Sequence, residues 1–286
     1  MDARPVIGLI AGQGTLPILC ARGMRAAGRR VACIGLRDQF LPELRQHCDD
    51  FAEAGMLQLG RWIRLAKRMG VVDAVMVGRV SKARMHDPLR LFRQLPDVRA
   101  ARLWYRRLRH DHRSATVLTA LAEELLANGV RLIDSTTFIP DQMASEGVLG
   151  RVQPSSLQSG DVAFAWPLFA KMLELDVGQA MAVRDRDVIA VEAVEGTDAM
   201  IDRAGQLCRA KGWTLLKSAR AGHDMRADVP TIGVPTVERV ARGGGGCIAV
   251  GAGRVILLDR PAVLAAADKL GVAIVGVKHD DVRAER

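Results

Sequence analysis

The sequence predicts an α/β protein with a parallel-sheet domain over residues 1–139 and a mixed α+β domain over residues 140–286. Two observations predict this fold class. The first part alternates short apolar runs with helix-like segments, which is the pattern of a doubly wound parallel sheet. The second part combines adjacent strand-like runs with several helices. At 286 residues, 49% of them hydrophobic, the chain is long enough for two cores.

In the first domain, each element is predicted from its apolar pattern and its end signals. The run Val6–Gly12 is short, apolar and closed by glycine, as suits a buried parallel strand. The other predicted strands are Arg30–Leu36, Val72–Val77 and Val130–Ile133, and the predicted helices are Leu16–Ala27, Trp62–Met69 and Ala115–Ala127. Strands and helices that alternate with short connections favour a Rossmann-like sheet.

The second domain begins where this alternation breaks down, in the polar and glycine-containing stretch 136–154. The predicted helices are Asp161–Leu175, Thr197–Lys211, Thr236–Arg242 and Pro261–Leu270. The predicted strands are Gln179–Val183, Val188–Ala193, Thr214–Lys217, Cys247–Val250, Val255–Leu258 and Val272–Val277. The charged turn 184–187 between the first two strands predicts a hairpin, so this domain is of mixed α+β type.

Composition excludes several classes of protein. No apolar run reaches the roughly 18 residues that span a bilayer, and glycines interrupt the start of the chain, so we expect a cytoplasmic protein without a signal peptide. Five scattered cysteines show no metal-binding spacing and are expected to be reduced core residues. Aromatic residues make up only 4%, which is low for a protein that stacks on single-stranded nucleic acid.

The net charge of +9 is concentrated between Arg79 and Arg113, where eleven lysines and arginines stand against three aspartates. Such a stretch can serve nucleic acid, an anionic membrane surface or an anionic substrate. It can equally be a solvated helix face, and the sequence leaves these alternatives open.

Two turns at strand ends are candidate ligand contacts. Gly12 and Gly14 lie at a strand-to-helix turn, where backbone N–H groups can approach a phosphate. Pro17 replaces the third glycine of a dinucleotide fingerprint and the usual acidic residue is missing, so an intact NAD(P) site is the weaker alternative and a tight structural turn another. Gly78 and Ser81 follow the next strand, in a cationic turn that would suit a diphosphate.

Acidic residues gather at two further places. Glu192 on a strand, and Glu195 and Asp198 at the turn that follows it, place three carboxylates within seven residues, beside Thr197. Thr197 or Asp198 can also act as an ordinary helix cap, but three carboxylates are more than a cap requires. Lys217 precedes a dense polar loop, Asp224–Gly233, that holds two aspartates and an arginine. Carboxylates beside cations can hold Mg²⁺ and orient a water while the cations take up phosphate charge. The chemistry of this loop therefore favours metal-assisted hydrolysis, with a plain polar loop as the alternative.

Six stretches of the sequence form an ordered set: Gly8–Pro17, Gly78–Ser81, Leu149–Val152, Gly178–Gln179, Glu195–Met200 and Arg226–Gly233. Taken together, they resemble the LpxI family of UDP-2,3-diacylglucosamine pyrophosphatases in lipid A biosynthesis. Each is weak alone, but six in register cover almost the whole chain.

The resemblance implies Mg²⁺-dependent hydrolysis of UDP-2,3-diacylglucosamine to UMP and 2,3-diacylglucosamine 1-phosphate, with a lipid-linked sugar nucleotide as substrate and no nucleic acid. It maps the family's essential acidic residue onto Asp228, which we expect to hold the metal or the attacking water. The matching stretches give Gly12, Gly14, Gly78, Ser81, Glu195, Thr197, Asp198 and Thr231 as candidate substrate-binding residues. Lys217 and Arg226 are added on chemical grounds, as cations that stabilise the charge developing on phosphate. Peripheral contact with an anionic inner membrane and a homodimer are left open. The rival predictions are a nucleotide-sugar or NAD(P) enzyme of another class and a basic nucleic-acid-binding protein.

Overall fold

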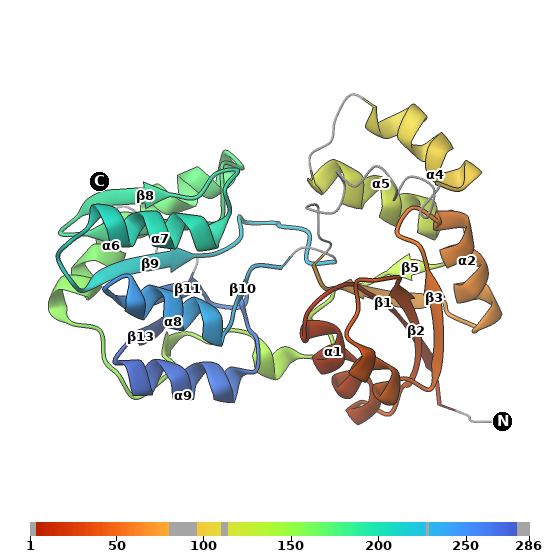
Figure 1. Cartoon of the computed structure of the whole chain (residues 1–286), viewed down its shortest axis with the longest axis horizontal. Helices are drawn as coiled ribbons and strands as arrows, with labels where there is room; N and C mark the ends of the chain where they lie inside the picture. The colour runs from red at the N-terminus through yellow and green to blue at the C-terminus, as the bar shows by residue number, and fades with distance from the viewer. Residues whose placement is uncertain (1–3, 80–95, 110–113, 227–228, 279–286) are drawn as a thin grey trace. The chain divides into compact units, whose positions relative to one another are not determined.

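The chain forms two compact units, each with its own sheet (Figure 1). The computed structural model describes residues 4–79, 96–109, 114–226 and 229–278. The first unit comprises Met1–Pro140 and Asp224–Asp228, and the second comprises Asp141–His223 and Val229–Arg286. The predicted α/β fold class is confirmed: a parallel sheet in the first unit and a mixed sheet in the second. With the expected boundary after residue 139, the chain would pass from one domain to the other once. In these units it passes between them three times, after Pro140, His223 and Asp228.

The first unit contains a five-stranded parallel sheet in the order β3-β2-β1-β4-β5. Its strands are β1 (Val6–Ala11), β2 (Arg30–Leu36), β3 (Asp50–Ala54), β4 (Asp73–Val77) and β5 (Arg131–Leu132). This is the 3-2-1-4-5 order of the Rossmann fold. The order reverses between β1 and β4, so the loops after these two strands lie side by side, and such a switch point is where open parallel sheets bind ligands.

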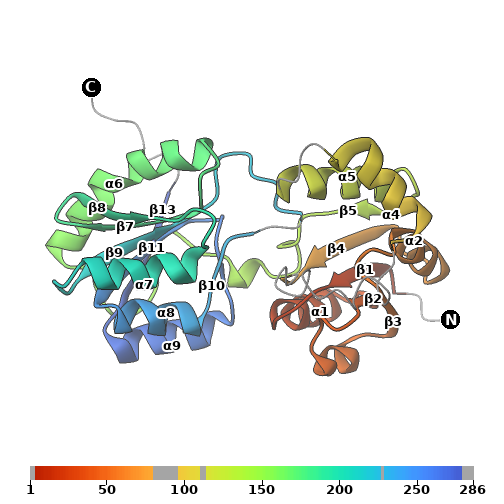
Figure 2. The same ribbon diagram turned by 45° about the horizontal axis from the view of Figure 1, so that its top comes forward.

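Helices cover both faces of this sheet (Figure 2). They are α1 (Leu16–Ala26), α2 (Leu59–Arg68), α4 (Val98–Leu103) and α5 (Ser114–Leu126), with short turns at Pro42–His47, Trp104–Leu108 and Pro140–Gln142. The side chains of β1 and β2 pack against α2 and α5 in one apolar layer, which buries Ile10, Ile34, Trp62 and Leu125. Each such side chain contributes roughly 1.5–3 kcal/mol to folding.

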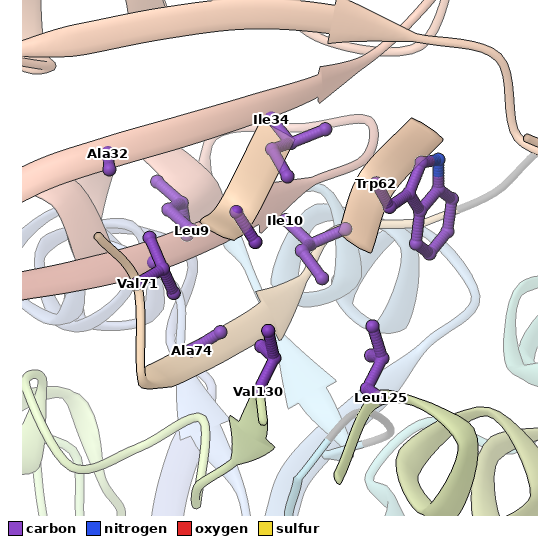
Figure 3. Close-up of a pocket in the computed structure, with 11 residues that line it drawn as sticks. Leu9, Ile10, Ala32, Ile34, Trp62, Val71, Ala74, Leu125 and Val130 are labelled. Carbon is purple, nitrogen blue, oxygen red and sulfur yellow. The ribbon is translucent and has the colours of Figure 1, made fainter. Parts of the chain in front are cut away.

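This apolar layer is well filled. Figure 3 shows Leu9, Ile10, Val71 and Trp62 among the side chains that line a cavity of about 10 Å³. A cavity of this size is at the lower limit for a single water molecule, so it is a packing gap and no ligand site. A larger hollow of about 470 Å³ lies at the amino ends of β1, β2 and β3, opposite the edge where parallel sheets bind ligands.

The edge strand β3 is absent from the expected elements. Its sequence, Asp50-Phe51-Ala52-Glu53-Ala54, lacks a long apolar run because the strand is only partly buried. Charged side chains are common on edge strands, where they discourage pairing with other molecules. Here Asp50 pairs with Arg30 at 2.6 Å and Glu53 pairs with Arg45. The strand therefore depends on its pairing with β2 more than on its own composition.

The second unit contains a six-stranded mixed sheet in the order β6-β13-β11-β9-β7-β8. Its strands are β6 (Gly147–Val148), β7 (Ala180–Arg184), β8 (Asp187–Val191), β9 (Trp213–Lys217), β11 (Gly245–Gly251) and β13 (Ala273–Val277). Strands β9, β11 and β13 are parallel, and β7 runs antiparallel to both β9 and β8. The carboxyl ends of β8, β9, β11 and β13 therefore meet at one edge. A separate parallel pair joins β10 (Thr231–Ile232) to β12 (Ile256–Leu257).

Helices enclose this sheet from both sides (Figure 2). They are α6 (Ser156–Glu174), α7 (Thr197–Leu207), α8 (Val234–Arg242) and α9 (Arg260–Leu270). One face packs on α6, and the other packs on α7, α8 and α9. Helix α6 begins five residues before its predicted start at Asp161, because Ser155 and Gln158 form a reciprocal capping box. None of the described helices is long and apolar enough to cross a bilayer.

All five cysteines are free, but Cys48 and Cys208 are only partly buried, so the expectation of core thiols holds for three. Burial raises the pKa of the Cys247 thiol from 9.0 to about 12. The folded state thus holds this proton more tightly than the unfolded state does. The contribution of this thiol to the free energy of unfolding is therefore fully present below pH 9.0. As the pH rises toward 12, that contribution falls by up to about 1.4 kcal/mol per pH unit.

Cys247→Ala is therefore expected to flatten the decline of the unfolding free energy above pH 9. Urea unfolding at a series of alkaline pH values measures this slope, whatever constant offset the substitution adds. Lysine and tyrosine titration affects wild type and variant alike. Parallel pH profiles for the two proteins would contradict the assignment.

Candidate active site

In the first unit, the loops after β1 and β4 pack backbone against backbone. The N–H of Gly12 donates to the Val77 carbonyl at 2.8 Å, and Gln13 and Arg79 exchange two hydrogen bonds of 2.8 and 3.0 Å. A Cβ on Gly12 would lie 2.7 Å from the Arg79 carbonyl oxygen. Gly78 has a φ of 98°, and its Cβ would lie 2.7 Å from the Gly12 carbonyl carbon. Both glycines are therefore required by loop packing, whatever else they contact.

Gly14 and Ser81 differ from this pair. Gly14 has a φ of 96° with open space around its Cα, so its left-handed backbone alone favours glycine there. It precedes α1, whose first turn is bonded to the Thr15 carbonyl. Ser81 lies outside the described residues. The turn can therefore present backbone N–H groups at the switch point, which is compatible with an anion contact.

At the carboxyl edge of the second sheet, three polar side chains form a hydrogen-bonded chain. Lys217 ends β9 and is only 6% exposed. Its Nζ donates to Thr197 Oγ1 at 2.6 Å. Thr197 opens α7, and its Oγ1 lies 3.0 Å from Glu192 Oε1, just after β8. The fold thus brings Glu192 and Thr197, both from the predicted acidic junction, together with Lys217.

The sequence placed Glu192 among the three carboxylates of the acidic junction but gave it no specific role. It lies near the carboxyl end of the predicted strand Val188–Ala193, the end from which sheets present ligand-binding groups. The N–H of Gln179 donates to its second oxygen at 3.3 Å, which orients the carboxylate. Ser218, the residue after Lys217, is fully buried, and its N–H donates to the carbonyl of the same Gln179.

The other acidic candidates of this stretch form surface ion pairs. Glu195 accepts hydrogen bonds from Arg203 at 2.5 Å and from the Ala193 N–H at 3.2 Å. A backbone hydrogen bond at Glu195 itself, and then Arg203, lower the pKa of this exposed carboxyl, against an opposing effect of desolvation. Asp198 lies 3.7 Å from Arg239. Neither is part of the chain of hydrogen bonds around Lys217.

Arg226 is engaged by its own neighbour. Its Nε and Nη2 donate to both oxygens of Asp224 at 2.6 to 3.1 Å, and its N–H donates to Asp224 Oδ1 at 3.0 Å. Asp224, and to a smaller degree Glu123, raise the pKa of the guanidinium. The turn is anchored to the first unit because Ser135 donates from both N and Oγ to the Met225 carbonyl. Asp224, whose role the sequence left undefined, therefore orients Arg226.

Asp224→Ala is expected to lower the unfolding free energy by less than about 1 kcal/mol, since both partners of the ion pair are about 40% exposed and water screens them. Urea unfolding measures the difference, and Asp224→Asn serves as the shape-matched control. A loss of several kcal/mol would mean that this turn carries more of the fold than its exposure suggests.

Two further candidates complete the set. Thr231 lies in β10, and its Oγ1 donates to the Val229 carbonyl at 3.0 Å, a local contact that shapes the turn. Asp228, the candidate catalytic residue, lies outside the described residues.

Among the residues that are described, no three His, Cys, Asp or Glu side chains come together as metal ligands. Since Asp224 is also occupied by Arg226, the described residues do not fit a preformed Mg²⁺ site.

A Rossmann-ordered parallel sheet in one unit and a mixed sheet in the other define a two-domain α/β protein. The model of the LpxI N-terminal domain matches residues 6–142, and that of the LpxI C-terminal domain matches residues 145–275. The chain therefore belongs to the LpxI family, as the sequence predicts.

A curated relative supports the same assignment. The UDP-2,3-diacylglucosamine pyrophosphatase LpxI of Caulobacter vibrioides is 33% identical to this chain over 282 residues. The alignment covers 95% of this chain and 97% of the Caulobacter protein. The similarity therefore runs through both units.

Proposed function

We propose that this protein hydrolyses the diphosphate of UDP-2,3-diacylglucosamine to UMP and 2,3-diacylglucosamine 1-phosphate. The observation that carries the proposal is the end-to-end similarity to the Caulobacter enzyme, which spans 95% of the chain. Fold alone would not select a reaction, because α/β sheets host many activities. The buried lysine at a sheet edge supports it chemically.

In the proposed reaction, water adds to one phosphorus of the diphosphate, and the bond from that phosphorus to the bridging oxygen breaks. The bridging oxygen leaves with the other phosphate, so each product carries one phosphate group. Asp228 accepts a proton from the attacking water, as general bases do. Lys217 offsets the negative charge that develops on the phosphoryl oxygens.

Each of the two units has its own set of proposed substrate contacts. In the first unit they are the backbone turns at Gly12, Gly14 and Gly78, with Ser81. Arg226 is a further proposed contact in this unit, and its hydrogen bonds to Asp224 hold the guanidinium in one orientation. In the second unit they are Lys217 and the residues near it, with Glu195, Asp198 and Thr231 as weaker candidates because each already has a partner.

The proposal includes a magnesium requirement. Mg²⁺ is commonly held by one or two carboxylates together with substrate phosphates, an arrangement that needs no preformed protein cage. Asp228 is the carboxylate that would hold it here. When bound, the ion would neutralise charge on the diphosphate.

Contact with a bilayer and a homodimer are also proposals. A diacylated substrate resides in a membrane, and basic residues near anionic headgroups contribute about 1 kcal/mol each. Part of the basic stretch is neutralised within the first unit, since Arg99 pairs with Glu124 and Arg107 pairs with Glu123. We propose a cytoplasmic enzyme whose basic stretch touches the inner membrane.

The test is incubation of the purified chain with UDP-2,3-diacylglucosamine, with Mg²⁺ or with EDTA, while UMP release is followed by chromatography. We expect UMP and the lipid phosphate in equal amounts with Mg²⁺, and a strong reduction with EDTA. Thermal shifts with UDP, UMP and NADP form the second arm. A large shift with NADP, none with UDP or UMP, and no UMP release would reject the proposed hydrolase.

A further inference from the structure

The hydrogen-bonded chain at the edge of the second sheet has a fixed direction. An ammonium group can only donate hydrogen bonds, and an ionised carboxylate can only accept them. Thr197 Oγ1 must therefore accept from Lys217 Nζ, at 2.6 Å, and give its single hydrogen to Glu192 Oε1, at 3.0 Å. The hydroxyl thus joins a buried cation to a carboxylate and has no second hydrogen to offer a substrate.

The start of α7 is an unfavourable place for a cation. The first N–H groups of a helix carry partial positive charge, which disfavours an ammonium beside them. The residue before Thr197 is Gly196, with a φ of 83° and no capping side chain. A buried ammonium held at this helix start requires a compensating anion. The described residue that supplies this charge through the Thr197 hydroxyl is Glu192.

The carboxylate is itself held in place. Its second oxygen accepts a hydrogen bond of 3.3 Å from the Gln179 N–H, and the Gln179 carbonyl accepts from the N–H of Ser218, the residue after Lys217. The backbone of Gln179, just before β7, thus links the two ends of the hydrogen-bonded chain: the Glu192 carboxylate and the residue that follows Lys217. The arrangement suits a group that orients another better than one that contacts a ligand.

We propose that Glu192 is a positioning residue which, through the Thr197 hydroxyl, fixes the Lys217 ammonium at the carboxyl edge of the second sheet. The position of the ammonium is inferred only from these hydrogen bonds. The use of that ammonium, to meet the charge on a substrate phosphate, rests on the proposed function. Thr197 is accordingly a relay and Lys217 the group that meets the substrate.

The kinetic test uses Glu192→Gln, which keeps the shape but removes the charge, and Thr197→Val, which removes the hydroxyl. Each is expected to lower kcat about 10- to 100-fold, the effect of losing a hydrogen bond to a charged group, with a smaller change in KM. Thr197→Ser restores the hydroxyl and should recover most of the rate. The double variant should be no slower than the slower single variant, because both changes break one chain.

The matched control is Asp202→Asn, which removes a carboxylate from the same helix α7, where it pairs with Arg239 at the surface. Its kcat should stay close to that of the wild type. Unchanged kcat in both Glu192→Gln and Thr197→Val would overturn the catalytic part of the proposal. A loss that Thr197→Ser fails to rescue would overturn the relay.

A second measurement does not depend on hydrolysis. The chain has seven lysines, so its ¹⁵N-labelled ammonium signals form a simple spectrum. A buried, hydrogen-bonded ammonium exchanges its protons slowly, and Lys217→Arg identifies the Lys217 signal by its loss. We expect this signal to shift or broaden in Glu192→Gln and Thr197→Val and to persist in Thr197→Ser and Asp202→Asn.

The two measurements separate this proposal from the proposed function. An unchanged Lys217 signal in Glu192→Gln would overturn the positioning role even if the wild type hydrolyses its substrate. A changed signal together with an inactive wild type would support the positioning role and reject the proposed reaction.

Discussion

Lys217→Met is expected to lower kcat/KM for UDP-2,3-diacylglucosamine by about 10²- to 10³-fold, the range found when one group that stabilises transition-state charge is removed. Methionine fills the space of the apolar lysine stem, and Lys217 is only 6% exposed. Because the change removes the cation that faces Glu192 through Thr197, some loss of stability is expected as well. The rate of UMP release measures the effect, and thermal unfolding shows that the variant is folded.

Lys269→Met is the matched control, because Lys269 is exposed in the last turn of α9. We expect its rate to remain within about twofold of the wild type, as for most surface substitutions. If Lys217→Met were folded and equally active, the ammonium would have no part in the reaction and the proposed site in the second unit would be wrong.

The central strands were predictable from the sequence because burial on both faces leaves a mark in composition. Val6–Ala11 and Arg30–Leu36 are apolar runs, and the pattern alone identified them. The edge strand Asp50–Ala54 was not predictable in this way, since its charged side chains face partners that only the folded unit supplies. The early start of α6 was signalled by Ser155 and Gln158, but Gly160 concealed it.

The candidate site was predictable to the extent that its residues stand at the ends of elements. Lys217 and Thr197 end a strand and begin a helix, and the fold joins them directly. Their partner Glu192 depends on how β7, β8 and β9 pair, which no local pattern states. Glu195 and Asp198 looked equally suitable, yet Arg203 and Arg239 engage them through contacts that the sequence does not encode locally.

Arg226 illustrates a different limit of sequence reasoning. The chemistry of the loop, with two aspartates and one arginine, predicts that the guanidinium takes up phosphate charge. In the structure, the two-residue spacing to Asp224 allows a turn in which both the backbone and the guanidinium bond to the same carboxylate. Composition gives the charges of such a loop, but the turn geometry decides which of them neutralise one another.

Asp228→Ala is expected to reduce kcat by about 10²- to 10⁴-fold, the usual contribution of a general base, with a smaller change in KM. The residue follows the Asp224–Arg226 turn and precedes Val229 and Pro230, whose carbonyl accepts from Ile256 in the second unit. No described carboxylate on this loop can replace it, because Asp224 is bonded to Arg226. UMP release under saturating substrate measures the loss.

Asp224→Asn separates the two aspartates of this loop. It keeps the local shape but weakens the ion pair with Arg226, so we expect at most a several-fold change in rate. If Asp228 acts as the base, the acidic limb of the kcat profile against pH should be lost in Asp228→Ala and retained in Asp224→Asn. Equal rates for wild type and Asp228→Ala would remove Asp228 from the mechanism, whereas a larger loss in Asp224→Asn would move the base four residues earlier. The pH profile therefore tests which carboxylate receives the proton, and membership of the LpxI family does not depend on its outcome.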